Sequence, residues 1–223
     1  MKPTVAIDGP AGGGKSTVSR AVAQALGYRY VDTGAMYRVV GVLADAAGID
    51  VGDGAALAAL CDGLDLRFEE HAGGLRVVAN GRDVSHAIRT AAAAQLASKV
   101  SVVPQVRERL VARQRALAAG GGVVMEGRDI GTVVLPDATV KIFLVASAAE
   151  RARRRAAELR GRGEAADETA MQAEIEERDR RDSNRAHSPL RPAADALLVD
   201  TTDVPVEAVV ARVRALIAAR GNP

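Results

Sequence analysis

The clearest chemistry in the sequence lies between Gly9 and Ser16, which read Gly-Pro-Ala-Gly-Gly-Gly-Lys-Ser. A glycine, four residues and then Gly-Lys-Ser form a P-loop, in which backbone N–H groups surround the phosphates of a nucleoside triphosphate. In such a loop Lys15 reaches the β- and γ-phosphates, and the Ser16 hydroxyl is a ligand for Mg²⁺. We therefore predict ATP as phosphate donor and Mg²⁺ as its metal. The predicted ATP site comprises Gly9, Pro10, Ala11, Gly12, Gly13, Gly14, Lys15, Ser16 and Thr17.

The P-loop alone does not say whether the terminal phosphate goes to water or to a small molecule. The base-selective Asn-Lys-x-Asp loop of a GTPase is absent, since Lys141 lies within an expected strand. A motor ATPase would carry an acidic pair that activates water, whereas Glu126 is followed by "GRDIG". The sequence therefore favours transfer to a small acceptor.

Two predicted strands end in polar residues. "VDTGAMYR" places Asp32 and Thr33 after the second strand, and "EGRDIG" places Arg128 and Asp129 after a later one. Because ligands bind at the carboxyl edge of a parallel sheet, we expect these residues to lie near the P-loop. Arg128 suits a substrate anion, although a surface arginine capping a strand remains an alternative. Asp32 is a second candidate Mg²⁺ group, acting through water.

Three further residues are candidates because of their spacing. Arg178, Asp182 and Arg185 are separated by i, i+4 and i+7, which predicts one face of a single helix. A solvated, salt-bridged face is the alternative interpretation of such a run. Similarly, a simple helix N-cap is the alternative interpretation of Thr33, and it is compatible with a role in the site.

The elements that must position these residues follow an α/β pattern. We predict a P-loop NTPase three-layer fold with a five-stranded parallel sheet, a small antiparallel insertion at about residues 60–100 and a helical lid at about 147–170. "HAGG" and "NG" predict tight turns within the insertion. The expected strands are 4–7, 28–31, 121–127, 139–146 and 194–202, and the expected helices are 16–26, 35–47, 106–119 and 205–220, with two more within 147–188.

Composition narrows the function classes. The formal net charge is +2, aromatic residues make up 2% of the chain and tryptophan is absent. These values disfavour an RNA-binding module, which would need a basic surface or aromatic stacking platforms. The single cysteine, Cys61, fits a reducing cytoplasm, and no apolar run is long enough to span a membrane. We expect a cytoplasmic protein that binds neither nucleic acid nor membrane.

Taken together, "DGPAGGGKST", "VDTGAMYR", "NGRDVSHAIRT", "EGRDIGTVVLPDATVKIFL" and "ERDRRDSNRAHSPLRPAADALLVDTT" resemble the bacterial cytidylate kinases. The resemblance covers essentially the full chain. It implies a monomeric single domain, residues 1–223, in which the insertion binds the nucleoside monophosphate. The implied reaction is ATP-dependent phosphorylation of CMP and dCMP. A kinase for another acceptor, such as shikimate, is the nearest alternative, and an ATP-dependent regulator is a more distant one.

The resemblance also implies roles for individual residues. Lys15, Arg128, Arg178, Asp182 and Arg185 are the implied catalytic residues. Arginines between Arg151 and Arg162 are expected to close on the transferring phosphoryl group. The implied monophosphate site comprises Thr33, Tyr37, Arg38, Ser98, Arg107, Arg128, Asp129, Arg178, Asp182 and Arg185.

Overall fold

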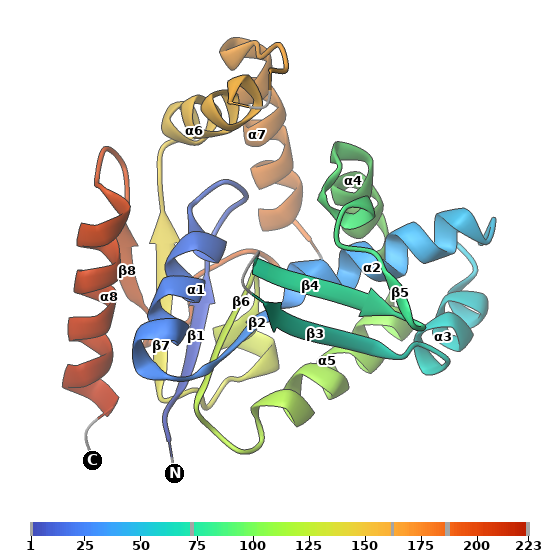
Figure 1. Cartoon of the computed structure of the whole chain (residues 1–223), viewed down its shortest axis with the longest axis horizontal. Helices are drawn as coiled ribbons and strands as arrows, with labels where there is room; N and C mark the ends of the chain where they lie inside the picture. The colour runs from blue at the N-terminus through green and yellow to red at the C-terminus, as the bar shows by residue number, and fades with distance from the viewer. Residues whose placement is uncertain (1, 72–73, 162, 186–187, 222–223) are drawn as a thin grey trace. The chain divides into compact units, whose positions relative to one another are not determined.

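The computed structural model describes residues 2–71, 74–161, 163–185 and 188–221 (Figure 1). The chain divides into two compact units. The first comprises residues 1–31 and 118–223, and the second comprises residues 32–117. The first contains the P-loop, and the second contains the predicted insertion.

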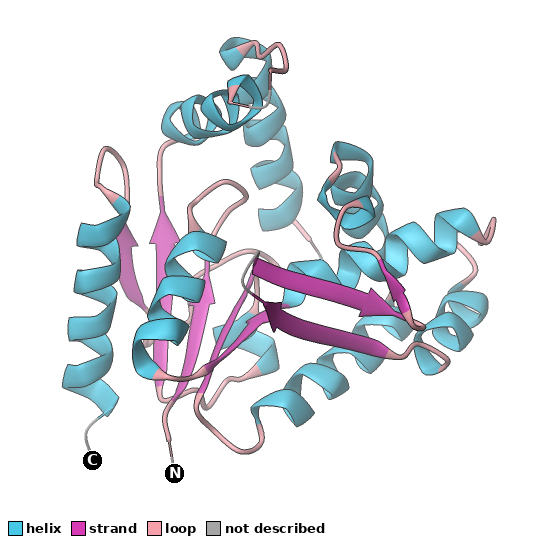
Figure 2. Ribbon diagram, in the orientation of Figure 1, coloured by secondary structure: helices cyan, strands magenta, loops and turns pink. Residues whose placement is uncertain are grey.

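The first unit is built on a five-stranded sheet with the order β2-β6-β1-β7-β8 (Figure 2). β1 pairs in parallel with β6 and β7, and β7 pairs in parallel with β8. Val5, Ala6 and Ile7 of β1 are fully buried, as expected for a central parallel strand covered on both faces. The strands are β1 (Thr4–Asp8), β2 (Arg29–Asp32), β6 (Val123–Gly127), β7 (Val140–Val145) and β8 (Leu197–Asp200).

The helices of this unit follow the strands. α1 packs against β6 and against α8, while α6 and α7 pack on each other. A five-residue π-helical turn, η2, follows β6 and was not predicted. The helical elements are α1 (Lys15–Leu26), η2 (Ile130–Val134), α6 (Ala148–Arg160), α7 (Glu168–Ser183) and α8 (Val206–Gly221).

The second unit has its own core. α2 lies so close to α4 that a Cβ on Gly41 would stand 2.8 Å from the Cβ of Leu96. Fully buried Met36 and Leu57 belong to this core, and α3 was not predicted. The elements are α2 (Thr33–Ala46), α3 (Gly54–Asp62), β3 (Leu66–His71), β4 (Gly74–Ala79), β5 (Arg82–Asp83), η1 (Ala87–Arg89), α4 (Ala91–Val100) and α5 (Pro104–Ala118).

The predicted antiparallel insertion forms the three-stranded sheet β3-β4-β5. Asn80 and Gly81 both have positive φ, 49° and 76°, the backbone that a tight type I′ hairpin requires. The "NG" turn is therefore confirmed, whereas residues 72–73 of the "HAGG" turn lie outside the described residues. Within the part of the chain that is described, no helix is long and apolar enough to cross a membrane.

Candidate active site

The donor loop, Gly9–Thr17, is shaped by its glycines. Gly12 and Gly14 have φ of 73° and 80°, the left-handed region that glycine adopts without strain. Gly9 has φ 151°, and a Cβ there would lie 2.3 Å from the carbonyl oxygen of Leu144. Gly14 caps α1 without any side-chain hydrogen bond. The first N–H groups of α1 therefore remain available to an anion.

Lys15 is buried, and its Nζ donates to the carbonyl oxygen of Pro10 over 2.6 Å. Burial is the largest cause that lowers its pKa, to about 7, and the positive charges of Arg128 and Arg178 lower it further. Glu126 and Asp8 oppose this shift. By contrast, Ser16 and Thr17 are exposed at the start of α1.

Asp182 binds two arginines that the sequence singled out, Arg128 by its position after a strand and Arg185 by its spacing. This carboxylate is almost fully buried, and it accepts from Arg128 Nε over 3.2 Å and from an Arg185 Nη over 2.6 Å. We call Arg128, Arg178, Arg185 and Asp182 the arginine cluster. One prediction is wrong in detail: α7 ends at Ser183, so Arg185 lies beyond the helix and not on its face. Its guanidinium still reaches Asp182, which lies three residues earlier in the chain.

Arg178 completes the cluster. Burial, and then the charge of Arg128, lowers the pKa of its guanidinium to about 10. Its buried Nε has no hydrogen-bond partner within the described residues. The Arg178 guanidinium lies near other arginines and has an N–H donor that is not used within the described residues. Such a group is suited to binding an anionic ligand.

Two strand-end carboxylates complete this region, and sequence reasoning assigned neither of them. Buried Glu126 accepts a hydrogen bond from the Tyr30 hydroxyl, and Asp8 accepts from backbone N–H groups after β6. Asp129, at the start of η2, is also buried. The position of Asp8, at a strand end directly before the donor loop, was the available signal.

In the second unit, Asp32 and Arg38 form an ion pair of 2.8 Å. Asp32 also accepts from the Ala35 N–H and is therefore the N-cap of α2. The N-cap interpretation of Thr33 is wrong, because Thr33 is the first residue inside the helix and is buried. Gly34 leaves room for this pair, since a Cβ there would lie 3.0 Å from a nitrogen of Arg38.

The other predicted acceptor residues of this unit come from three helices. An Arg107 Nη donates to the Tyr37 hydroxyl over 3.4 Å, linking α5 to α2. Ser98 is half-buried on α4, where its carbonyl accepts from the Ser101 hydroxyl. The structure therefore joins Tyr37 with Arg107 and Arg38 with Asp32. Within the described part of the chain, Ser98 has no side-chain contact of this kind.

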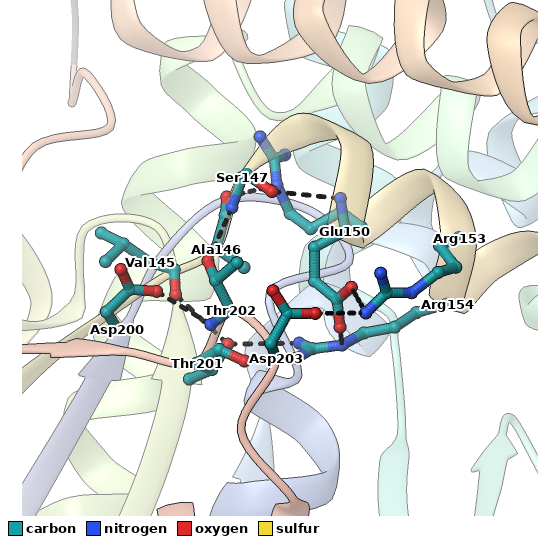
Figure 3. Close-up of polar contacts among 11 residues, drawn as sticks. Val145, Ala146, Ser147, Glu150, Arg153, Arg154, Asp200, Thr201, Thr202 and Asp203 are labelled. Atoms are coloured by element: carbon teal, nitrogen blue, oxygen red, sulfur yellow. Dashed lines mark hydrogen bonds and ion pairs between the residues drawn. The ribbon is translucent and has the colours of Figure 1, made fainter.

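The arginines of α6 are held by protein groups (Figure 3). Arg154 donates to Glu150 over 2.7 Å and to the hydroxyl and carbonyl oxygens of Thr201, while Arg153 pairs with Asp203 over 2.6 Å. A Cβ on Gly14 would lie 3.7 Å from an Arg154 nitrogen, so this guanidinium stands beside the donor loop. Arg162 lies outside the described residues.

Arg151 has three partners. Its guanidinium donates to the carbonyl oxygens of Ala146, over 3.0 Å, and Ala11, over 3.1 Å, and to Asp179 over 2.6 Å. The side chain is almost completely buried, and it passes close to Gly12. One residue therefore ties the donor loop to α7, the helix that carries Arg178 and Asp182.

Comparisons with known proteins identify the family of the chain. The sequence model described as "Cytidylate kinase" matches residues 5–219. The chain belongs to the cytidylate kinase family. The cytidylate kinase of Pelotomaculum thermopropionicum is 54% identical over 97% of this chain and 96% of its own. That of Geobacter sp. strain M21 is 51% identical over 92% and 88%.

Membership of the cytidylate kinase family makes the chain a kinase, and the predicted enzyme class and resemblance are confirmed. Among solved structures, a gluconokinase from Sinorhizobium meliloti aligns with a TM-score of 0.52, at 16% identity over 98% of this chain and 93% of that one. At this identity the likeness concerns the fold alone. It agrees with the predicted P-loop fold class, which the five-stranded parallel sheet confirms.

Proposed function

We propose that the protein transfers the γ-phosphoryl group of ATP to CMP and dCMP, giving ADP and CDP or dCDP. Family membership supports the reaction, and one observation carries the assignment of residues to it. The charges of Arg128 and Arg178 both lower the pKa of Lys15, so the donor loop and the arginine cluster share one electrostatic environment. Such a concentration of positive charge suits two phosphate groups brought together.

The chemistry asks little of the protein beyond positioning. An oxygen of the acceptor monophosphate is already ionised, so it attacks the γ-phosphorus without a general base. The new P–O bond forms as the bond to the β,γ-bridging oxygen breaks, and ADP leaves with those electrons. Lys15 and the arginine cluster would align the two nucleotides and neutralise the charge of the transferring group.

Mg²⁺ fits the donor loop as a metal that arrives with ATP. The Ser16 residue is exposed at the start of α1, where a hydroxyl oxygen suits a hard cation. The Asp32 carboxylate already accepts hydrogen bonds from the Ala35 N–H and from Arg38. We therefore propose that it contacts Mg²⁺ through a water molecule and not directly. Among the described residues no group of three acidic, histidine or cysteine side chains could hold a metal. When bound, Mg²⁺ would offset phosphate charge.

We retain the residues assigned to the monophosphate acceptor. They are Thr33, Tyr37, Arg38, Ser98, Arg107, Asp129 and the members of the arginine cluster. We retain the assignment of residues 1–223 to one kinase domain, with a monophosphate-binding insertion at about 60–100 and a lid at about 147–170. Closure of α6 arginines over the phosphates would exclude water and suppress hydrolysis of ATP. We also propose that the enzyme is a monomer and works in the cytoplasm, where its nucleotides are found.

A nucleotide panel tests the proposal. ADP release would be followed with ATP and each of CMP, dCMP, UMP, AMP, GMP and shikimate, with ATP alone as the control for hydrolysis. We expect the highest kcat/KM with CMP or dCMP and little release without an acceptor. A preference for any other acceptor would overturn the assignment.

A further inference from the structure

Asp8 makes an unusual pair of contacts at the base of the donor loop. It is the last residue of β1 and is buried, directly before Gly9. Its Oδ1 accepts from the N–H of Ile130 over 2.8 Å, and its Oδ2 accepts from the N–H of Gly131 over 2.7 Å. Both oxygens of one carboxylate therefore hold the first two residues of η2.

The partner segment is shaped to receive this carboxylate. The first N–H groups of a helical turn have no partner within it, so a carboxylate there satisfies them both. A Cβ on Gly131 would stand 3.2 Å from the Lys141 side chain and 3.4 Å from the Asp8 carboxylate. Glycine at 131 therefore lets the backbone approach Asp8 as closely as these bonds require.

The same segment carries two residues assigned to the acceptor. Asp8 lies in register with Gly127 across the β1–β6 ladder, and Arg128 and Asp129 stand between Gly127 and the two N–H groups. We propose that Asp8 is a positioning residue, whose carboxylate fixes η2 and thereby sets where Arg128 and Asp129 stand. The inference rests on the proposed function, because it gives Asp8 an effect on the acceptor phosphate through Arg128.

The charge of Asp8 matters to this role. An ionised carboxylate accepts at both oxygens, whereas a protonated one presents an O–H to one of the two N–H groups. Burial raises the pKa of Asp8 to about 6, against the lowering effect of the Gly131 and Ile130 N–H groups. Of the charged neighbours, Asp129 raises this pKa and Lys15 lowers it. At neutral pH the carboxylate is therefore ionised, and the turn is held.

Stability and activity should consequently respond to acid in opposite ways. Because the pKa of Asp8 is higher in the folded protein than its usual 3.8, the folded state binds the proton more tightly. The contribution of Asp8 to stability therefore increases as the pH falls from about 6 to about 4. Over the same range the hold on η2 weakens. A purely structural carboxylate would not separate these two effects.

Asp8→Asn tests the role, with Asp53→Asn as the matched control. Asp53 also accepts one backbone N–H, from Ala56, but is exposed at the start of α3. For Asp8→Asn we expect kcat to fall about tenfold or more and the KM for CMP to rise, because the amide donates where Gly131 also donates. The wild-type loss of kcat below about pH 6 should disappear in the variant. Wild-type kcat and KM, or an unchanged acid limb, would overturn the proposal.

A second measurement needs neither a variant nor a substrate. Amide NMR of the wild-type protein from pH 7.5 to 4.5 should show the Ile130 and Gly131 N–H signals moving together near pH 6. Their protection against hydrogen exchange, relative to the intrinsic rate at each pH, should be lower at acid pH. The Ser101 N–H, which donates to a backbone carbonyl, is the reference. Signals that do not titrate would overturn the hold of Asp8 on η2. If instead they titrate and the wild type does not phosphorylate CMP, the proposed function fails and the contact remains.

Discussion

The donor loop and the arginine cluster both concentrate positive potential, but they do so by different means. The donor loop is a contiguous segment whose glycine backbone turns N–H groups toward an anion, and it adds one lysine. The arginine cluster gathers side chains from separate segments, and a buried carboxylate, Asp182, holds Arg128 and Arg185. An anion site made of backbone N–H groups can therefore be formed by one short stretch of sequence. A site made of several neighbouring arginine side chains also needs a buried carboxylate that offsets their mutual repulsion.

The largest expected effect is on the donor side, from Lys15→Ala. We expect kcat to fall by about 10²–10³-fold, since one donor aimed at the developing charge is removed. Thermal unfolding should remain cooperative, because within the described residues the lysine side chain donates a single hydrogen bond, to the carbonyl oxygen of Pro10. Lys99→Ala, at an exposed lysine on α4, is the control. Turnover within a few-fold of wild type would contradict the role of Lys15.

The second-largest effect is expected from a substitution that disrupts the arginine cluster. Asp182→Asn keeps the shape of the side chain but leaves Arg128, Arg178 and Arg185 without their buried counter-charge. We expect kcat/KM for CMP to fall by about 10²-fold, while the KM for ATP changes far less. Steady-state kinetics with each substrate varied will measure this. Glu177→Gln, on the exposed side of α7, is the control, and equal losses for both substrates would argue against an acceptor-side role.

A smaller effect is expected in the second unit, from Arg38→Ala. Arg38 is more exposed than Asp182 and is paired with Asp32, so a single phosphate contact is at stake. We expect the KM for CMP to rise about tenfold with little change in kcat. Arg109→Ala is a close match, because Arg109 is similarly exposed and pairs with Asp62. Equal behaviour of the two variants would remove Arg38 from the site.

The smallest effect concerns pH. The pKa of Lys15 is lowered to about 7, so the free enzyme loses this charge as the pH rises through 7. We expect kcat/KM for ATP to decline several-fold between about pH 7 and pH 8. Lys15→Arg, whose guanidinium stays protonated, should lack this decline whatever its absolute rate. An identical alkaline limb in both proteins would assign the titration to another group.

The same contrast explains how much the sequence could predict. The donor loop was predictable, because Gly9, Gly14 and Lys15 act through local backbone geometry that their spacing reports. The Asn80–Gly81 turn was predictable for the same reason. The strands of the parallel sheet were predictable from their short apolar runs, although their pairing joins residues far apart in the chain, such as Thr4 and Val123.

What escaped prediction depends on tertiary contacts. The contact of Asp8 with Gly131 spans more than a hundred residues, and no local pattern reports it. The i, i+4, i+7 spacing correctly grouped Arg185 with Asp182, but it did not show that the helix stops at Ser183. The π-helical turn of η2 was missed because its backbone is fixed by what it packs against.

The contacts of Arg151 suggest a way to inhibit the enzyme. Its guanidinium joins the Ala11 carbonyl of the donor loop to Asp179 of α7, so neither can shift without disturbing the other. A small molecule that displaced Arg151 from these partners would impair ATP binding and the α7 residues together. Its inhibition should then be relieved by neither excess ATP nor excess CMP, unlike that of a nucleotide analogue.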